Sequence, residues 1–254
     1  MLSQGDTNSL DMERYTEFDF SLDADRKIAL VSAPGVFLPT GTTKLLIKAV
    51  EQTVSEPVAM LDLGCGSGVV GLALYLRGLV KTPLFASDLS EPAVRCSRMN
   101  HERYGCSSDI RRGPLFEPWP GQRFDVIVDD ISGVAQEVAA VSPWFDGVPC
   151  ESGRDGTSLV VDIIRKAPRH LASRGRFFFP VISLSKADIL LDEAAKNFST
   201  VERISRQEWP LPDELKLQMP LLDRLNDEGC IKLHKRFGMV LWYTEIYCAS
   251  EARD

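Results

Sequence analysis

The sequence has few histidines and no metal-binding arrangement of cysteines. Its three histidines are scattered. Its six cysteines form no C-x-x-C pair and no Cys/His combination with zinc spacing; they stand at positions 65, 96, 106, 150, 230 and 248. Several lie within apolar runs, where a free thiol behaves as a small hydrophobic side chain. We therefore expect a reduced, cytoplasmic protein without a metal site.

Positive charge is also in short supply. The chain has 29 Lys and Arg residues against 36 Asp and Glu residues, which gives a net charge of -7 at pH 7. A nucleic-acid-binding domain usually carries a basic surface. We therefore do not expect a nucleic-acid partner, although Arg111 and Arg112 are a candidate for a local basic patch.

Long hydrophobic runs are missing as well. No stretch approaches the roughly 20 apolar residues that a membrane-spanning helix needs. The polar, acidic start MLSQGDTNSLDMERY lacks the apolar core of a signal peptide. Repeats and low-complexity linkers are also missing, so we expect one domain over residues 1–254 and no membrane partner. Within it, residues 1–45 would form an N-terminal extension or lid and 46–254 the core. The sequence does not predict an oligomeric state.

What is present is an alternation of strand-like and helix-like segments from residue 58 onward. Strands are expected at 58–63, 83–88, 124–130 and 176–181 and around residue 110, with helices at 68–76, 91–101, 157–171 and 186–198. This alternation predicts an α/β fold: a Rossmann-like, seven-stranded, mainly parallel sheet with helices on both faces. A helical insertion near 212–229 separates the last two strands, 201–208 and 239–248. Without a crossover helix between them, the last strand is expected to be antiparallel.

The N-terminal part is predicted from weaker patterns. Short strands are expected at 28–31 and 36–38, followed by a helix over 44–50 that Thr42 or Thr43 would cap. Tyr15 and Phe18 would contribute either to core packing or to a lid over the site.

A glycine-rich stretch, LDLGCGSG at residues 61–68, lies between a predicted strand and a predicted helix. Glycines at such a junction permit tight turns and close approach of a ligand to the backbone. The spacing differs from the dinucleotide pattern G-x-G-x-x-G, because Val69 occupies the third glycine position. A phosphate-binding G-K-S/T segment is absent. The next predicted strand ends at Asp88, whose carboxylate would either bind ribose hydroxyls or cap the following helix.

The run Asp62, Gly64, Gly66, Gly68 resembles the acidic-x-Gly-x-Gly-x-Gly signature of class I S-adenosylmethionine-dependent methyltransferases. The resemblance implies S-adenosylmethionine as cofactor and S-adenosylhomocysteine as product. It also implies that the acid at position 88 holds the ribose of the cofactor.

Three further segments are similar to the HemK-like group of these enzymes. They are FLPTGTTKLL (37–46), DIRRGPLFEPWPGQRFDVIVDDISG (109–133) and GRDGTSLVVDIIRKAPRHLASRGRF (153–177). Two departures stand out: Pro114 replaces the aspartate of the group's G-D-L-F, and Asp130-Ile131-Ser132-Gly133 replaces its N-P-P-Y. The group's residues for gripping a planar amide are therefore missing, and methylation of release-factor glutamine is not implied.

Two adjacent carboxylates, Asp129 and Asp130, end the predicted strand at the sheet edge where ligands bind in open α/β folds. Alternation places them on opposite sides of the strand. A carboxylate at this edge would orient an amine and accept its proton. We therefore expect N-methylation of an amine, guanidine or amide nitrogen on a small molecule or a protein side chain.

Several alternatives stay open. One aspartate would cap the following turn while the other is merely hydrated. In a second alternative, the protein is an O-methyltransferase. In a third, it binds S-adenosylmethionine without catalysing a reaction. Trp144 and Glu151 follow the strand in a loop that is expected to roof the pocket, where an aromatic ring can hold a cation; simple loop packing is the alternative.

The sequence thus nominates three sets of site residues. Catalytic candidates are Asp129 and Asp130, and substrate-binding candidates are Asp130, Trp144 and Glu151. The cofactor-binding candidates are Thr43, Asp62, Gly64, Cys65, Gly66, Gly68, Asp88, Leu89, Leu115 and Asp129.

Overall fold

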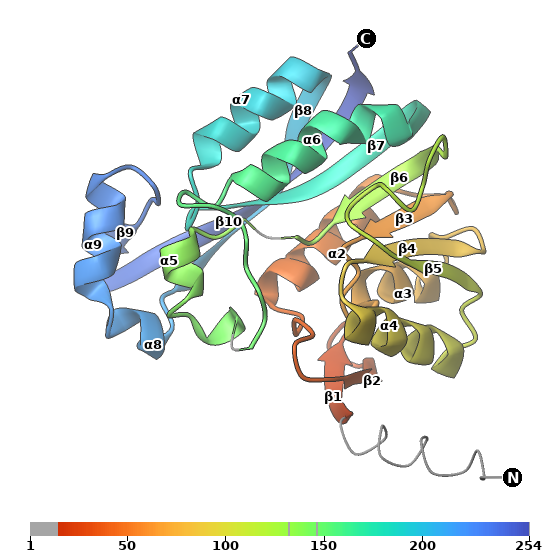
Figure 1. Ribbon diagram of the computed structural model, residues 1–254, viewed down its shortest axis with the longest axis horizontal. Coiled ribbons are helices and arrows are strands. Elements are labelled where there is room, and N and C mark those ends of the chain that lie inside the picture. The colour runs from red at the N-terminus through yellow and green to blue at the C-terminus, as the bar shows by residue number, and fades with distance from the viewer. Residues whose placement is uncertain (1–14, 132, 146, 254) are drawn as a thin grey trace, which may run out of the picture.

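The computed structural model describes residues 15–131, 133–145 and 147–253. Its centre is a twisted sheet with the strand order β5-β4-β3-β6-β7-β10-β8, and β9 adds to β10 (Figure 1). The strands are β3 (Met60–Leu63), β4 (Leu84–Asp88), β5 (Ser108–Arg112), β6 (Phe124–Asp129), β7 (Leu171–Ile182), β8 (Phe198–Pro210), β9 (His234–Arg236) and β10 (Met239–Ala252). The five neighbouring strands β5, β4, β3, β6 and β7 run parallel, whereas β10 is antiparallel to both β7 and β8. The predicted fold class and the antiparallel last strand are confirmed.

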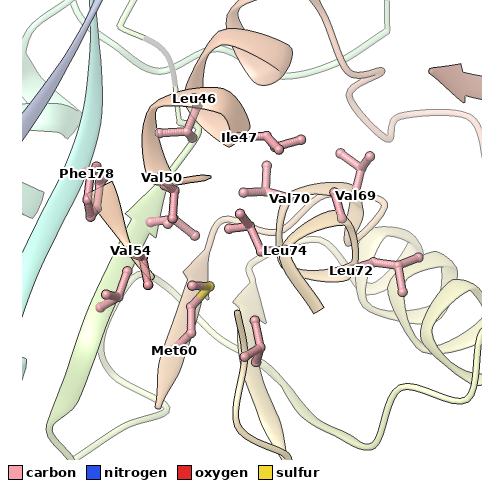
Figure 2. Packing of buried hydrophobic residues seen from close by; sticks show 14 of the residues in the cluster. Leu46, Ile47, Val50, Val54, Met60, Val69, Val70, Leu72, Leu74 and Phe178 are labelled. Carbon is pink, nitrogen blue, oxygen red and sulfur yellow. The ribbon is translucent and has the colours of Figure 1, made fainter. Parts of the chain in front are cut away.

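Helices cover both faces of the sheet. One face packs against α2 (Gly41–Thr53) and α3 (Val69–Leu76), and α4 (Glu91–Arg103) lies beside α3. The other face packs against α6 (Ser158–His170) and α7 (Ala187–Asn197). Figure 2 shows the first of these cores, where Leu46 and Val50 of α2 lie near Val70 and Leu74 of α3.

Alternation along the strands divides the sheet residues between these two cores. In β3, Met60 belongs to the α2–α3 core and Leu61 to the α6–α7 core; in β6, Val128 and Ile127 divide in the same way. Because side chains alternate along a strand, Asp62 and Asp130 point to the side of α2 and α3. Two acids from neighbouring strands are thereby brought to one side of the sheet edge.

The N-terminal region differs from its prediction. A hairpin of β1 (Thr16–Ser21) and β2 (Lys27–Ser32) docks on α4, where the Asn100 amide exchanges hydrogen bonds with the backbone of Val31 at 2.8 and 3.0 Å. The expected strand at 36–38 is wrong, because these residues form an irregular segment. Phe18 packs against the α2–α3 core, as the core-packing alternative predicted.

The cap of α2 was also misplaced. Thr40, rather than Thr42 or Thr43, is the N-cap: its hydroxyl accepts from the Thr42 backbone N–H at 3.2 Å. The Thr43 hydroxyl in turn accepts from the Thr40 backbone N–H at 3.0 Å, which completes a capping box.

A lobe at one end of the sheet contains the insertion. It consists of α5 (Gln136–Ala139), the 3-10 turn Pro143–Phe145, α8 (Asp213–Lys216), α9 (Met219–Asp227) and β9 (Figure 1). These elements share a third apolar core with the adjoining end of β7 and β10. The helices α8 and α9 lie within the stretch predicted to be a helical insertion, whereas β9 was not predicted. None of the helices within the described ranges is long and apolar enough to cross a membrane.

Candidate cofactor and acceptor site

The turn between β3 and α3 requires glycine for steric reasons. Gly64, Gly66 and Gly68 have φ values of +65°, +54° and +78°, a region that side chains rarely tolerate. A Cβ at Gly64 would lie 2.3 Å from Cγ1 of Ile131, and one at Gly68 would lie 2.3 Å from the Ser97 hydroxyl. At Gly66 the nearest heavy atom would be 3.8 Å away. The first and third glycines therefore permit packing, while the second leaves its backbone open to the cavity.

His101 supports this turn from α4. Its Nε2 lies 3.1 Å from the Gly68 carbonyl oxygen, so the neutral ring donates a hydrogen bond there. Burial lowers the pKa of His101 to about 4. The histidine is a buried residue that supports the turn, and its Nδ1 atom has no hydrogen-bond partner among the described residues.

Asp88 ends β4 directly beside the glycine turn. One carboxylate oxygen accepts from the Gly66 backbone N–H at 2.9 Å and the other from Ser90 N–H at 2.8 Å. The cap of α4 is Ser90, whose hydroxyl accepts from Ala93 N–H. The alternative that Asp88 itself caps the helix is therefore wrong. Burial raises the pKa of Asp88 against these two hydrogen bonds.

A cavity of about 470 Å³ opens over this edge of the sheet. Its volume is in the range of pockets that hold small ligands. Asp62 and Asp88 lie on its wall together with Asp130, and Leu89 and Leu115 add apolar surface. The Leu89 side chain is 65% exposed, which is unusual for a leucine and leaves it free to cover a planar ligand. The cavity thus combines open glycine backbone, carboxylates and apolar walls.

Asp62 and Asp130 are the electrostatically unusual members of this wall. Burial raises the pKa of both carboxyl groups to about 7, and their mutual repulsion adds to the shift of Asp62. Asp62 accepts from Gly71 N–H at 2.9 Å, but its second oxygen is buried without a hydrogen-bond partner. Asp130 accepts from the Thr43 hydroxyl at 2.7 Å. A cationic ligand in the cavity would favour the ionised form of both acids.

Asp129 has a different position from its neighbour. Its side chain is fully buried and is not among the residues that line the cavity. One oxygen accepts from Ile131 N–H at 2.8 Å, so the carboxyl caps the turn that follows β6. Burial raises its pKa well above the ordinary value. The turn-capping alternative describes Asp129, and Asp130 is the aspartate that faces the cavity.

The structure brings most of the nominated residues together. The cavity wall contains the candidates Asp62, Gly64, Cys65, Gly66, Asp88, Leu89, Leu115, Asp130 and Glu151. Thr43 and Gly68 do not line the cavity: Thr43 contacts Asp130 through a hydrogen bond, and Gly68 ends the glycine turn. Trp144 does not line this cavity but a neighbouring aromatic one. Its predicted place in the roof is taken by Phe145.

Sequence reasoning missed the contribution of residues 35–39 to the cavity, above all Phe37. A signal was present, since Phe37 opens the segment that resembles the HemK-like group. The basic patch considered at positions 111 and 112 is not free: Arg111 pairs with Asp109 at 2.6 Å, and Arg112 lies 3.5 Å from Glu91.

The chain matches proteins of known activity over this region. A family model described as ribosomal protein L11 methyltransferase (PrmA) matches residues 18–144, half of the chain. A release factor glutamine methyltransferase of Geobacter sulfurreducens is 27% identical over 169 residues, covering 63% of this chain and 58% of the relative. A ribosomal protein L11 methyltransferase of Parasynechococcus marenigrum is 34% identical over 146 residues, covering 54% and 48%. The chain thus spans about half the length of these curated relatives.

Solved structures support the fold. The 16S rRNA N2 G1207 methyltransferase of T. thermophilus, solved with AdoMet and guanosine, superimposes with a TM-score of 0.59 at 15% sequence identity. The superposition covers 94% of this chain and 51% of the other. At this identity the likeness concerns the arrangement of the sheet and helices.

Proposed function

Because the chain belongs to the ribosomal protein L11 methyltransferase (PrmA) family, we propose that it transfers a methyl group from S-adenosylmethionine to a nitrogen atom. The observation that carries the proposal is the placement of Asp62, Asp88 and Asp130 around one cavity beside open glycine backbone. When bound, the cofactor supplies an electrophilic methyl group on a sulfonium. The protein supplies the orientation, the exclusion of water and the proton acceptor.

The cavity offers the hydrogen-bond acceptors and the apolar surface that this cofactor needs. The Asp88 carboxylate, held by two backbone N–H groups, is the acceptor for ribose hydroxyls. Leu89 and Leu115 provide apolar surface for the adenine, and Pro114 beside them offers no side-chain hydrogen bond. At the other end of the cavity, Asp62 would face the positively charged part of the cofactor.

Asp130 is the residue we assign to the acceptor nitrogen. The Thr43 hydroxyl fixes its carboxylate, and a pKa near 7 keeps the carboxylate basic enough to take a proton from an ammonium group. Methyl transfer itself depends mainly on in-line positioning. Asp130 would therefore orient and deprotonate the acceptor, while Asp129 shapes the turn that holds Asp130.

The proposal also covers the chemical class of the acceptor nitrogen. An amine, guanidine or amide fits the acidic wall, on a small molecule or on a protein side chain. The names of the relatives, which refer to ribosomal protein L11 and to release factors, favour protein acceptors. A carboxylate acceptor, as in the O-methyltransferase alternative, would be repelled by Asp62 and Asp130.

The first test uses S-adenosylmethionine labelled on the methyl group, incubated with separated protein and metabolite fractions of a cell extract. We expect base-stable label in one fraction, because N-methyl groups survive mild alkali whereas methyl esters do not. With the labelled acceptor, Asp130→Asn should lower kcat/KM by about 100-fold, in line with the loss of a general base. Asp162→Asn, an exposed change in α6, is the control.

The wild-type kcat/KM should rise with pH through about 7, following the pKa of Asp130. The Asp130→Asn variant should lose this inflection. Full turnover in the variant, or base-labile label, would refute the assignment of Asp130 to a nitrogen acceptor.

A further inference from the structure

A second cavity, of about 270 Å³, adjoins the cofactor cavity on the side of the insertion. We call it the aromatic pocket. Its lining residues are Phe37, Thr40, Gly41, Thr42, Val134, Trp144, Phe145, Ile182, Trp209, Pro210 and Trp242. Three of the four tryptophans of the chain meet here, and the fourth, Trp119, is buried in the α6–α7 core.

The polar atoms of this pocket are occupied by the protein itself. The indole N–H of Trp209 donates to the Thr244 hydroxyl at 3.2 Å, and that of Trp242 donates to the Pro210 carbonyl at 3.3 Å. The Thr42 hydroxyl lies 3.1 Å from the Thr244 hydroxyl. None of the lining residues is charged. The pocket therefore presents ring faces and aliphatic surface, which suit an apolar group.

The aromatic pocket adjoins the cofactor cavity and shares two lining residues with it. Phe37 and Phe145 line both cavities, with their ring centroids 5.2 Å apart. Thr40 and Thr42 line the aromatic pocket, and Thr43 of the same helix turn donates to Asp130. The first turn of α2 therefore contributes both to the lining of the pocket and to the residue that holds Asp130.

The size of the pocket sets the size of the group. An apolar protein cavity of about 150 Å³ is known to bind benzene. At about 270 Å³, the aromatic pocket accommodates a group of one or two rings. The acids in the adjoining cavity favour a cationic nitrogen at the other end of the same molecule.

We propose that the aromatic pocket binds the ring of the methyl acceptor, and that the acceptor is an arylalkyl amine whose nitrogen reaches Asp130. This inference rests on the proposed function and names the substrate class for it. Trp209 and Pro210 end β8 directly before the insertion, and the insertion packs in the same apolar core as Trp242. Specificity for the ring would therefore reside in the lobe outside the cofactor site.

One substitution would change the shape of the aromatic pocket without removing any of its rings. Gly41 begins α2 against the Trp209 indole, and a Cβ there would lie 2.7 Å from the Cη2 atom of that ring. Gly41→Ala therefore forces the Trp209 indole, which lines the pocket, out of its present position. Trp144→Ala, by contrast, enlarges the pocket and removes one of its ring faces.

The probes are phenethylamine and putrescine, an amine of similar length without a ring. Binding is measured by tryptophan fluorescence and calorimetry with S-adenosylhomocysteine present, and methylation with labelled S-adenosylmethionine. Phenethylamine should perturb the fluorescence and saturate, whereas putrescine should not. Trp144→Ala and Gly41→Ala should each weaken phenethylamine binding at least tenfold and raise its KM, without changing the affinity for S-adenosylhomocysteine. Phe237→Ala, in an exposed turn, is the control.

Equal binding of the two amines, or phenethylamine binding that neither pocket substitution changes, would overturn the inference. A further arm with the peptide Phe-Gly-Gly shows whether the ring comes from a free amine or from an N-terminal residue. The cofactor titration distinguishes a failure of the proposed function from a failure of the proposed substrate class. Loss of S-adenosylmethionine binding contradicts the proposed function, whereas cofactor binding without ring recognition contradicts only the substrate class.

Discussion

At the scale of single residues, the site is defined by carboxyl groups that are buried on the same side of the sheet. Asp62 comes from β3 and Asp130 from β6, two strands that pair in parallel. Each accepts a hydrogen bond, yet burial still raises the pKa of both groups to about 7. Such acids are destabilising when ionised, and binding sites commonly tolerate this cost. A bound cation would relieve it.

The raised pKa of Asp62 predicts a pH-dependent stability difference between wild type and Asp62→Asn. Because the folded protein holds this proton more tightly than the unfolded chain, the stabilising effect is present at acid pH and is lost as the pH rises from about 4 to 7. Relative to wild type, the variant should gain up to roughly 1.4 kcal/mol per pH unit across that interval.

Urea unfolding of both proteins at pH 5, 6 and 7 measures this difference. Using the difference cancels His101, whose lowered pKa acts in the opposite direction as the pH falls through its unfolded value. A constant gap between the two proteins at all three pH values would show that Asp62 titrates normally.

At the scale of elements, the connection between β6 and α6 crosses itself at two glycines. A Cβ on Gly133 would lie 2.0 Å from the carbonyl oxygen of Gly156, and one on Gly156 would lie 2.7 Å from the backbone nitrogen of Ala135. The segment after Asp130 is thereby fixed beneath the start of α6. Residues 148–152, which line the cavity, belong to the same connection. The roof of the site is thus packed closely against residues 133–135, which follow Asp130 in the chain.

Gly133→Ala should therefore separate the two segments. We expect a loss of about 1–3 kcal/mol of stability, the usual cost of overpacking, together with weaker S-adenosylhomocysteine binding by calorimetry. Gly121→Ala is the matched control: Gly121 has φ +70° but open space around its Cβ position, in the turn before β6. It should lower stability through backbone strain and leave the affinity intact. If both variants keep wild-type affinity, the crossing does not hold the roof.

At the scale of the whole molecule, charge and shape favour cations at this edge of the sheet. The chain carries a net charge of -7, and four acidic residues, Asp62, Asp88, Asp130 and Glu151, line a single concave site. Fields of one sign are concentrated in such clefts and raise the local concentration of oppositely charged ligands.

A salt titration separates this effect from ordinary contacts. S-adenosylmethionine carries one more positive charge than S-adenosylhomocysteine, and the two molecules otherwise differ by a methyl group. Raising the salt from 20 to 300 mM should weaken the binding of the first more than that of the second, because screening acts on the additional charge. The ratio of the two Kd values, measured by calorimetry, is the observable. A ratio independent of salt would mean that the carboxyl groups stay protonated around the ligand.

The sequence predicted those parts of the fold that depend on local periodicity. The strand–helix alternation gave the parallel sheet, and the missing crossover before residue 239 gave the antiparallel last strand. Asp88 and the glycine turn were identified as candidates because they resemble the signature of a known methyltransferase class, and the structure places them side by side. The strand expected at 36–38 failed because its hydrophobic residues pack in an irregular segment, where Val36 is buried and Leu38 is exposed.

The aromatic pocket could not be predicted because its parts lie far apart in the chain. Trp209 and Trp242 meet through the pairing of β8 with β10, whereas Phe37 and Trp144 come from distant segments of the chain. The separate positions of Asp129 and Asp130 were half predicted. Alternation placed them on opposite sides, but the sequence could not tell which side holds the cavity.

The placement of β10 has a consequence for biosynthesis. This strand, residues 239–252, fills the interior position between β7 and β8, so the edges of β7 and β8 that face each other stay unpaired until β10 has been synthesised and inserted. Exposed edges of this kind invite pairing with other chains. The nascent protein should therefore be prone to aggregation, and should benefit from chaperones, until β10 is inserted between β7 and β8.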